Sequence, residues 1–237
     1  MTSPATRPPD VAARPARDPL LGIAIVGVAL VYVRALLFTP IEAMQGAAQK
    51  ILYIHATSAF IALYVAFVLM AIASILYLWL KDEKLDRVAE SAAEVGLAFT
   101  TVVLVTGPLW GKTIWGAWWT WDARLTSTLF LWFIIVAYGL LRGAVEDRGR
   151  RARYSAVLGI LAALLVPFIH LSVYLFRTLH PMPILLKPSA PSMPAEMQVT
   201  FFSAFAAFLL LFAALLRSRY RIATLRDRVA DLEQERA

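Results

Sequence analysis

Five of the seven tryptophans in this 237-residue chain lie within twelve positions, from Trp110 to Trp121. The run lies between two apolar stretches long enough to cross a bilayer, which places it at a membrane surface. Aromatic belts occur at both membrane interfaces, and such a belt is the simpler interpretation. A dense patch also indicates a flat aromatic ligand, because its rings can stack on one. If this segment is helical, one face carries Trp115, Trp118, Trp119 and Asp122.

The chain has only three histidines, His55, His170 and His180. Imidazole is mostly neutral at pH 7, and the neutral ring can ligate a metal ion. Two histidines on opposite sides of a tryptophan platform could therefore bind a haem iron at its two axial positions. A lone histidine in a membrane protein more often has a structural role, and packing in an apolar helix end explains His170. The better pair of iron ligands is His55 and His180.

Cations near the tryptophan run could bind the carboxylates of such a ligand, since Arg–carboxylate pairs are charge-assisted and often bidentate. Arg124 could do this or could pair locally with Asp122, and Arg177 is a second candidate. Lys50 and Lys112, taken singly, are more simply solvated loop charges. No catalytic residue is predicted. The complete set of candidate ligand-binding residues is His55, His180, Trp110, Trp115, Trp118, Trp119, Trp121, Asp122, Arg124 and Arg177.

The composition is that of a membrane protein. It is 60% hydrophobic and only 16% charged, whereas an ordinary soluble domain is about one-quarter charged. Several apolar stretches exceed about 18 residues, which predicts an all-α, polytopic fold. A disordered tail is expected over 1–18, and a short amphipathic helix within 217–237, packed on the membrane surface or on a partner subunit. Six spans are predicted within a domain covering 19–216, at about 19–38, 51–80, 90–110, 125–142, 153–173 and 198–216.

The net charge of +7 reflects membrane topology and not nucleic-acid binding, because the basic residues gather in short loops and tails. The side of the membrane with both termini carries seventeen Lys and Arg residues, and the other side carries five. The positive-inside rule places the richer side in the cytoplasm. The tryptophan loop 110–124, the loop 174–197 and all three histidines then face outward. In a bacterium with an outer membrane this is the periplasmic face of the inner membrane.

The sequence lacks the motifs of several other kinds of site. Cysteine is absent, which excludes disulfides, cysteine metal sites and covalent haem attachment through C-x-x-C-H. The segment Gly107–Thr113 resembles a phosphate loop, but it has one residue too few between its glycines, and Thr106 stands where a glycine is required. We reject it, so this chain alone should not hydrolyse ATP. Glu90 and Glu94, at the start of the third span, are expected to be helix-N-terminal carboxylates and not a proton path.

These residues resemble a known family. The segment Trp115-Gly-Ala-Trp-Trp-Thr-Trp-Asp-Ala-Arg-Leu-Thr-Ser127 is similar to the WWD signature of haem-handling proteins, and above all to the cytochrome c maturation protein C family, also called haem exporter protein C. Lys50–His55 resembles the first haem-ligand segment of that family, and Ser172–His180 resembles the second. The chain departs from the family pattern at Leu175-Phe176-Arg177 and in the residues that follow each histidine.

The resemblance implies a haem-transfer subunit that is not an enzyme, although it could promote haem attachment to its acceptor. Such proteins hold haem b non-covalently and transiently at the outer face, and they deliver it to a periplasmic haem chaperone for cytochrome c maturation. They work with ABC-type ATPase and permease subunits and a small single-span subunit. If the roles of the family's motif residues are transferred to this sequence, His55 and His180 are the axial ligands. The segment 115–122 then forms the cradle for the macrocycle.

Three other functions remain as alternatives. A b-type cytochrome electron-transfer subunit also uses two histidines, but its histidines usually lie on facing helices inside the bundle, whereas His180 lies in a Pro-rich loop. A permease would need a polar path, and the spans have few polar residues. An assembly subunit would suit the C-terminal helix but would leave the tryptophan run unexplained.

Overall fold

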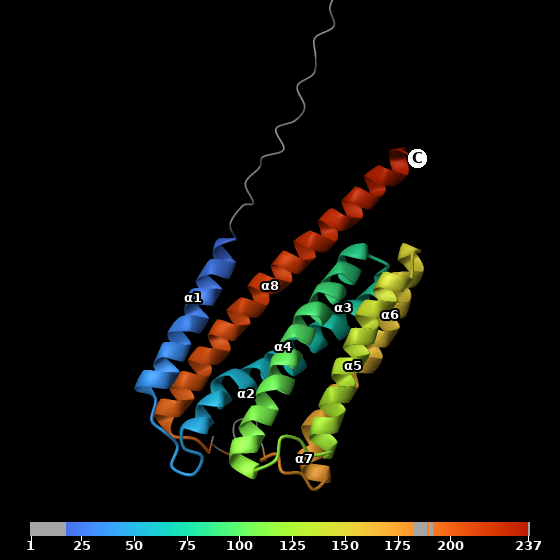
Figure 1. Cartoon of the computed structure of the whole chain (residues 1–237). Coiled ribbons are helices and arrows are strands. Elements are labelled where there is room, and N and C mark those ends of the chain that lie inside the picture. Colours follow the sequence, from blue (N-terminus) through green and yellow to red (C-terminus); the bar gives the residue numbers. More distant parts are fainter. Residues whose placement is uncertain (1–17, 183–188, 190–191, 237) are drawn as a thin grey trace, which may run out of the picture.

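The fold is a bundle of membrane-spanning helices (Figure 1). The computed structural model describes residues 18–182, 189 and 192–236. Among these residues there are helices and loops but no β-strand, and six helical segments are long and apolar enough to cross a membrane. The predicted all-α class with six spans is thereby confirmed. Nearly all of the predicted disordered tail, residues 1–17, lies outside the described residues.

Several spans are built from more than one helical segment. The first span is α1 with a π-helical turn, η1, and the second runs through η2, α2, the π-helical η3 and α3. The fifth is divided at Leu164, because Pro167 has no N–H for the carbonyl oxygen of Ala163. The bounds are α1 Pro19–Val33, η1 Arg34–Phe38, η2 Ala47–Ile51, α2 Leu52–Phe60, η3 Ile61–Ala66, α3 Phe67–Leu80, α4 Glu83–Trp115, α5 Ala123–Ala144, α6 Arg148–Ala163, α7 Leu165–Leu175 and α8 Ala195–Arg236.

The two ends of the bundle differ in their residues. The start of α1 and the end of α8 lie at one end, together with the α3–α4 and α5–α6 connections (Figure 1). We call this the basic end, because Arg142, Arg148 and Arg226 lie there. The opposite end holds the end of α4 and the start of α5, and we call it the tryptophan end. Pro19 and Arg236 are thus on the same side of the bundle, as an even number of spans requires.

The tryptophan run is not one helix. Helix α4 ends at Trp115, because Gly116 has a φ of +74° in the left-handed region that favours glycine. The chain is then non-helical until α5 begins at Ala123, with the Asp122 side chain as its N-cap. The predicted common helical face of Trp115, Trp118, Trp119 and Asp122 is therefore wrong.

The expectation for Glu90 and Glu94 is also wrong. Helix α4 begins at Glu83, where the Asp82 carboxylate accepts a 2.9 Å hydrogen bond from the Lys84 backbone N–H, so both glutamates lie well inside the helix. Glu90 is buried and forms ion pairs with Arg142, at 3.0 Å, and with Arg226, at 2.7 Å. Glu94 pairs with Arg219. These carboxylates bind helix α4 to α5 and α8.

Helix α8 is continuous from Ala195 to Arg236. At about 1.5 Å per residue, its 42 residues extend roughly twice the ~30 Å of a hydrocarbon core. The stretch predicted as a separate C-terminal helix is thus the continuation of the sixth span at the basic end. One face of it is held by ion pairs such as Arg87–Asp227, at 3.1 Å, and Arg148–Asp231, at 2.6 Å. Four apolar residues at helical spacing in this stretch are each more than half exposed: Ile222, Leu225, Val229 and Leu232.

Candidate functional site

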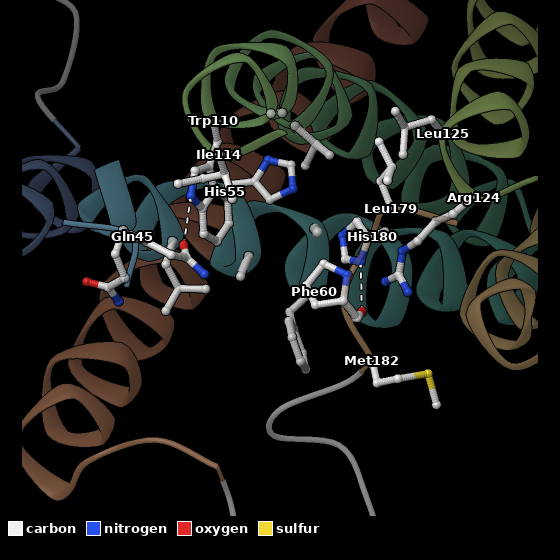
Figure 2. A pocket seen from close by; sticks show the side chains of 18 of the residues that line it. Gln45, His55, Phe60, Trp110, Ile114, Arg124, Leu125, Leu179, His180 and Met182 are labelled. Atoms are coloured by element: carbon white, nitrogen blue, oxygen red, sulfur yellow. Dashed lines mark hydrogen bonds between the residues drawn. The ribbon is translucent and has the colours of Figure 1, made fainter. Parts of the chain in front are cut away.

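A cavity of about 710 Å³ opens at the tryptophan end. Helices α2, α4, α5 and α7 and the π-helical η3 form its walls, with residues from 40–49, 179–182 and 192–197. The lining is mostly apolar, and all three histidines of the chain belong to it. Figure 2 shows the labelled side chains of His55, Arg124 and His180 directed into this space from different elements.

His55 lies on α2 and is held against α4. Its Nδ1 is 3.0 Å from the Thr106 hydroxyl oxygen, and that hydroxyl donates its hydrogen to the Val102 carbonyl at 2.7 Å. The Val102 carbonyl can only accept, so the hydroxyl hydrogen is assigned to it; Thr106 then accepts from His55, and Nδ1 carries the ring proton in this assignment. The lone pair of Nε2 is therefore free to ligate a metal ion. The Trp110 ring lies edge-on to the imidazole, with centroids 5.7 Å apart.

His180 lies in the loop that follows α7. Its Nδ1 is 3.0 Å from the Pro181 carbonyl oxygen, and because a carbonyl can only accept, Nδ1 again carries the proton. Nε2 is thus free in both histidines. The burial of His180, and next the positive charge of Arg124, lower its pKa to about 4, so the ring is neutral at physiological pH. The Trp115 ring lies 6.4 Å from the imidazole, centroid to centroid.

Asp122 positions the His180 loop. One carboxylate oxygen accepts from the Leu125 backbone N–H at 2.9 Å and caps α5, while the other accepts from the Thr178 hydroxyl at 2.7 Å. The Thr178 hydroxyl oxygen in turn accepts from the His180 backbone N–H at 3.0 Å. Asp122 is not among the residues that line the cavity. Its contacts make it an anchor for the loop.

Arg124 lies in the first turn of α5 and lines the cavity beside His180 (Figure 2). One of its guanidinium nitrogens, Nη1, is buried without a hydrogen-bond partner. Among the described residues it has no ion pair with Asp122, so the predicted local pair is not formed. A buried cation without a partner is a candidate binding group for an anionic ligand.

The predicted tryptophans divide into two groups. Trp110, Trp115 and Trp119 line the cavity, and the Trp119 indole N–H is buried without a partner. Trp118 and Trp121 do not line it and are 57% and 77% exposed. The exposed pair follows Gly116, where the helix has ended, and the side chains there no longer share the direction of those on α4.

Other predicted cations also lie outside the cavity. Arg177 is exposed and is not part of the lining. Lys112 donates to the Gly116 carbonyl at 3.0 Å, and Lys50 donates to the carbonyls of Ala35, at 2.6 Å, and Thr39. The two lysines thus bind carbonyl groups near the ends of helical segments, which is a structural role.

Sequence reasoning missed some of the residues that form the cavity. His170 was assigned to packing, yet it lines the cavity, and its Nδ1 is 2.6 Å from the Tyr64 hydroxyl. Thr106 and Gly107 were considered only as part of a false phosphate loop. A contact between residues that are 51 or 106 positions apart leaves no periodic signal in a single sequence.

These features define a multi-pass helical membrane protein with a large, mostly apolar cavity lined by histidine, tryptophan and arginine at one end of its bundle. The chain belongs to the heme exporter protein C family, since the family model of that description matches residues 9–235.

Relatives named Heme exporter protein C are similar over most of their length. The protein from Bradyrhizobium diazoefficiens is 37% identical over 198 residues, which are 84% of this chain and 75% of the relative. The protein from Haemophilus influenzae is 35% identical over 207 residues, 87% of this chain and 83% of the relative. The Escherichia coli K12 protein is 35% identical over 185 residues, 78% and 74% of the two chains.

Proposed function

We propose that this protein binds haem at the tryptophan end of its bundle and delivers it to a periplasmic haem chaperone for cytochrome c maturation. His55 and His180 are the axial iron ligands in this proposal. The observation that carries it is the pair of imidazoles that enter one cavity, each with Nδ1 engaged by an acceptor and Nε2 free. The names of the relatives, which describe exporters of heme, support the same ligand.

The residues of the cavity fit a haem. Its volume of about 710 Å³ lies within the range of small-molecule sites, roughly 300–1,000 Å³. Trp110, Trp115 and Trp119 offer apolar rings that can stack on a porphyrin. Arg124 offers an unpartnered guanidinium N–H to a propionate. The absence of cysteine excludes thioether attachment of haem and supports non-covalent binding of haem b.

The arrangement also suits release. His55 is held between two helices, whereas His180 is held in a loop by the Thr178–Asp122 contact. Loss of the His180 ligand therefore requires movement of a loop and not of a membrane span. The exposed Trp118 and Trp121 near this loop give the chaperone an aromatic surface to contact.

Membrane topology and partners form the rest of the proposal. The excess of Lys and Arg at the basic end supports a cytoplasmic position for that end by the positive-inside rule, and in this proposal the cavity faces the periplasm from the inner membrane. This chain carries no recognised ATPase motif. We therefore propose that it works as a haem-transfer subunit with ABC-type ATPase and permease subunits and a small single-span subunit.

The test is an absorption spectrum of the purified protein with haem, recorded before and after addition of the chaperone. We expect a low-spin spectrum that is lost in H55A and in H180A, and haem that leaves the wild-type protein when the chaperone is added. H170A tests the third histidine of the cavity, whose Nδ1 is 2.6 Å from the Tyr64 hydroxyl; it should retain the spectrum if His55 and His180 are the two ligands.

Two results would contradict this function. Haem that stays through chaperone addition and cycles readily between redox states would indicate a b-type cytochrome. If neither the wild-type protein nor any variant binds haem, the tryptophans are better explained as an aromatic belt at the membrane interface.

A further inference from the structure

The segment of α4 that resembles a broken phosphate loop packs directly against His55. We propose that Thr106 and Gly107 form a cradle that fixes the ring orientation and the tautomer of His55, so that Nε2 faces the cavity. The inference rests on the proposed function, in which His55 ligates iron. Thr106 is in this view a positioning residue, which acts on the iron through the histidine.

The contacts of Thr106 assign the tautomer. The hydroxyl oxygen lies 2.7 Å from the Val102 carbonyl oxygen, one helical turn back, and 3.0 Å from His55 Nδ1. Because the carbonyl can only accept, the hydroxyl hydrogen is assigned to it, and the hydroxyl oxygen then offers His55 a lone pair. A protonated Nδ1 satisfies that lone pair, and Nε2 is left unprotonated. Metal-ligating histidines commonly have such an outer hydrogen bond, which fixes the ring and raises the basicity of the ligand nitrogen.

Gly107 leaves room for the ring. A Cβ added there would lie 3.2 Å from His55 Cε1 and 3.7 Å from Nδ1. The first distance is shorter than an ordinary carbon–carbon contact, so any larger residue would push the imidazole away from α4 and lengthen the bond to Thr106. Trp110, one turn further along α4, lies edge-on to the same ring at 5.7 Å. Three positions of one helix thus fix the imidazole.

The first experiment measures haem binding by T106V, T106S and G107A. Valine has nearly the shape of threonine but no acceptor, and we expect haem affinity to fall about 10- to 100-fold, the usual effect of losing an outer-shell partner. The high-spin fraction of the bound haem should rise. Serine keeps the acceptor, so T106S should restore both. T113V is the matched control, because Thr113 lies on the same helix and its hydroxyl donates to the Trp110 carbonyl at 2.7 Å, but it does not line the cavity.

The second experiment uses the haem-free protein, so it does not depend on the proposed function. With only three histidines, the ¹⁵N spectrum of histidine-labelled protein can be assigned from the H55A, H170A and H180A variants. We expect His55 to be protonated at Nδ1 in wild type and T106S, and to move toward the Nε2-protonated form in T106V. An unchanged His55 tautomer in T106V overturns the inference whatever the haem spectra show. A wild-type protein that binds no haem overturns the proposed function, and the ¹⁵N spectrum then decides the role of Thr106 alone.

Discussion

Helix α5 carries an arginine near each end, and the two have different surroundings. Arg142, in the last turn, is 7% exposed and donates two hydrogen bonds to the Asp86 carboxylate, at 2.7 and 2.8 Å, and one to Glu90 at 3.0 Å. Arg124, in the first turn, lines the cavity with Nη1 buried and unpartnered. Each guanidinium leaves one nitrogen buried without a partner. Arg142, however, forms ion pairs with two carboxylates, whereas Arg124 forms none among the described residues.

The difference separates a structural charge from a functional one. The helix macrodipole favours a cation at the C-terminal end and disfavours one at the N-terminal end, so Arg142 is well placed and Arg124 is not. Burial without a partner adds a further cost to Arg124. Residues that break the rules of stable packing in this way concentrate at functional sites. We infer that the partner of Arg124 is an anionic group of the ligand.

The largest expected effect is on stability at the basic end. R142M leaves the Asp86 and Glu90 carboxylates without this cation, and removing one member of a buried ion pair typically costs about 3–5 kcal/mol. Unfolding of the detergent-solubilised protein by denaturant would measure it. Haem affinity of the folded protein should be unchanged. Equal stability of R142M and wild type would mean that this network is not structural.

The corresponding change at the tryptophan end should affect binding and not stability. R124M removes a buried unpaired charge, so the protein should be as stable as wild type or more so. Loss of a charge-assisted hydrogen bond to a propionate, worth about 1.5–3 kcal/mol, should lower haem affinity by roughly 10- to 100-fold. Titration with haem and with its dimethyl ester tests this, because R124M should no longer distinguish the two. R177M, an exposed cation outside the cavity, is the control and should behave like wild type.

A smaller effect is expected from two N-cap aspartates, one at each end of the bundle. Asp122 caps α5, and Asp147 caps α6 by accepting from the Arg150 backbone N–H at 2.7 Å. D122A and D147A should each cost about 1 kcal/mol of stability. Only D122A also releases Thr178, so only D122A should raise the high-spin fraction of bound haem. If the two variants give the same haem spectrum, Asp122 has no role beyond the cap.

The smallest effect concerns pH. Because the pKa of His180 is lowered to about 4 from the ordinary value of about 6.5, the unfolded chain takes up this proton more readily between these two values. His180 therefore lowers stability as pH falls through that window, and it does not affect stability at neutral pH. The neutral ring should keep ligating iron at pH 5.5. In R124M the pKa of His180 should rise, since one of its two main causes is gone, and a spectral pH titration should show ligand loss at a higher pH.

Much of the fold could be predicted from the sequence, and rather less of the cavity. Hydropathy located all six spans, because length and apolar composition suffice for that. The start of α4 was placed too late, since the search began at apolar residues and passed over the Asp82 cap. Residue type selected His55, His180, Arg124 and the cavity tryptophans, and the structure places them around one space. Trp118 was included on the assumption of a helix through Gly116, and Trp121 for its place in the tryptophan run, but neither lines the cavity.

The contacts that hold the two proposed iron ligands become possible at different times during synthesis, which proceeds from the N-terminus. The cradle of His55 lies wholly within the first three spans and is complete once α4 has been made. The anchor of His180 joins Asp122, just before the fourth span, to Thr178, just after the fifth span. A nascent chain that stops after α4 would have one ligand in place and lack the other. Two-ligand capture is thereby restricted to chains that are nearly finished.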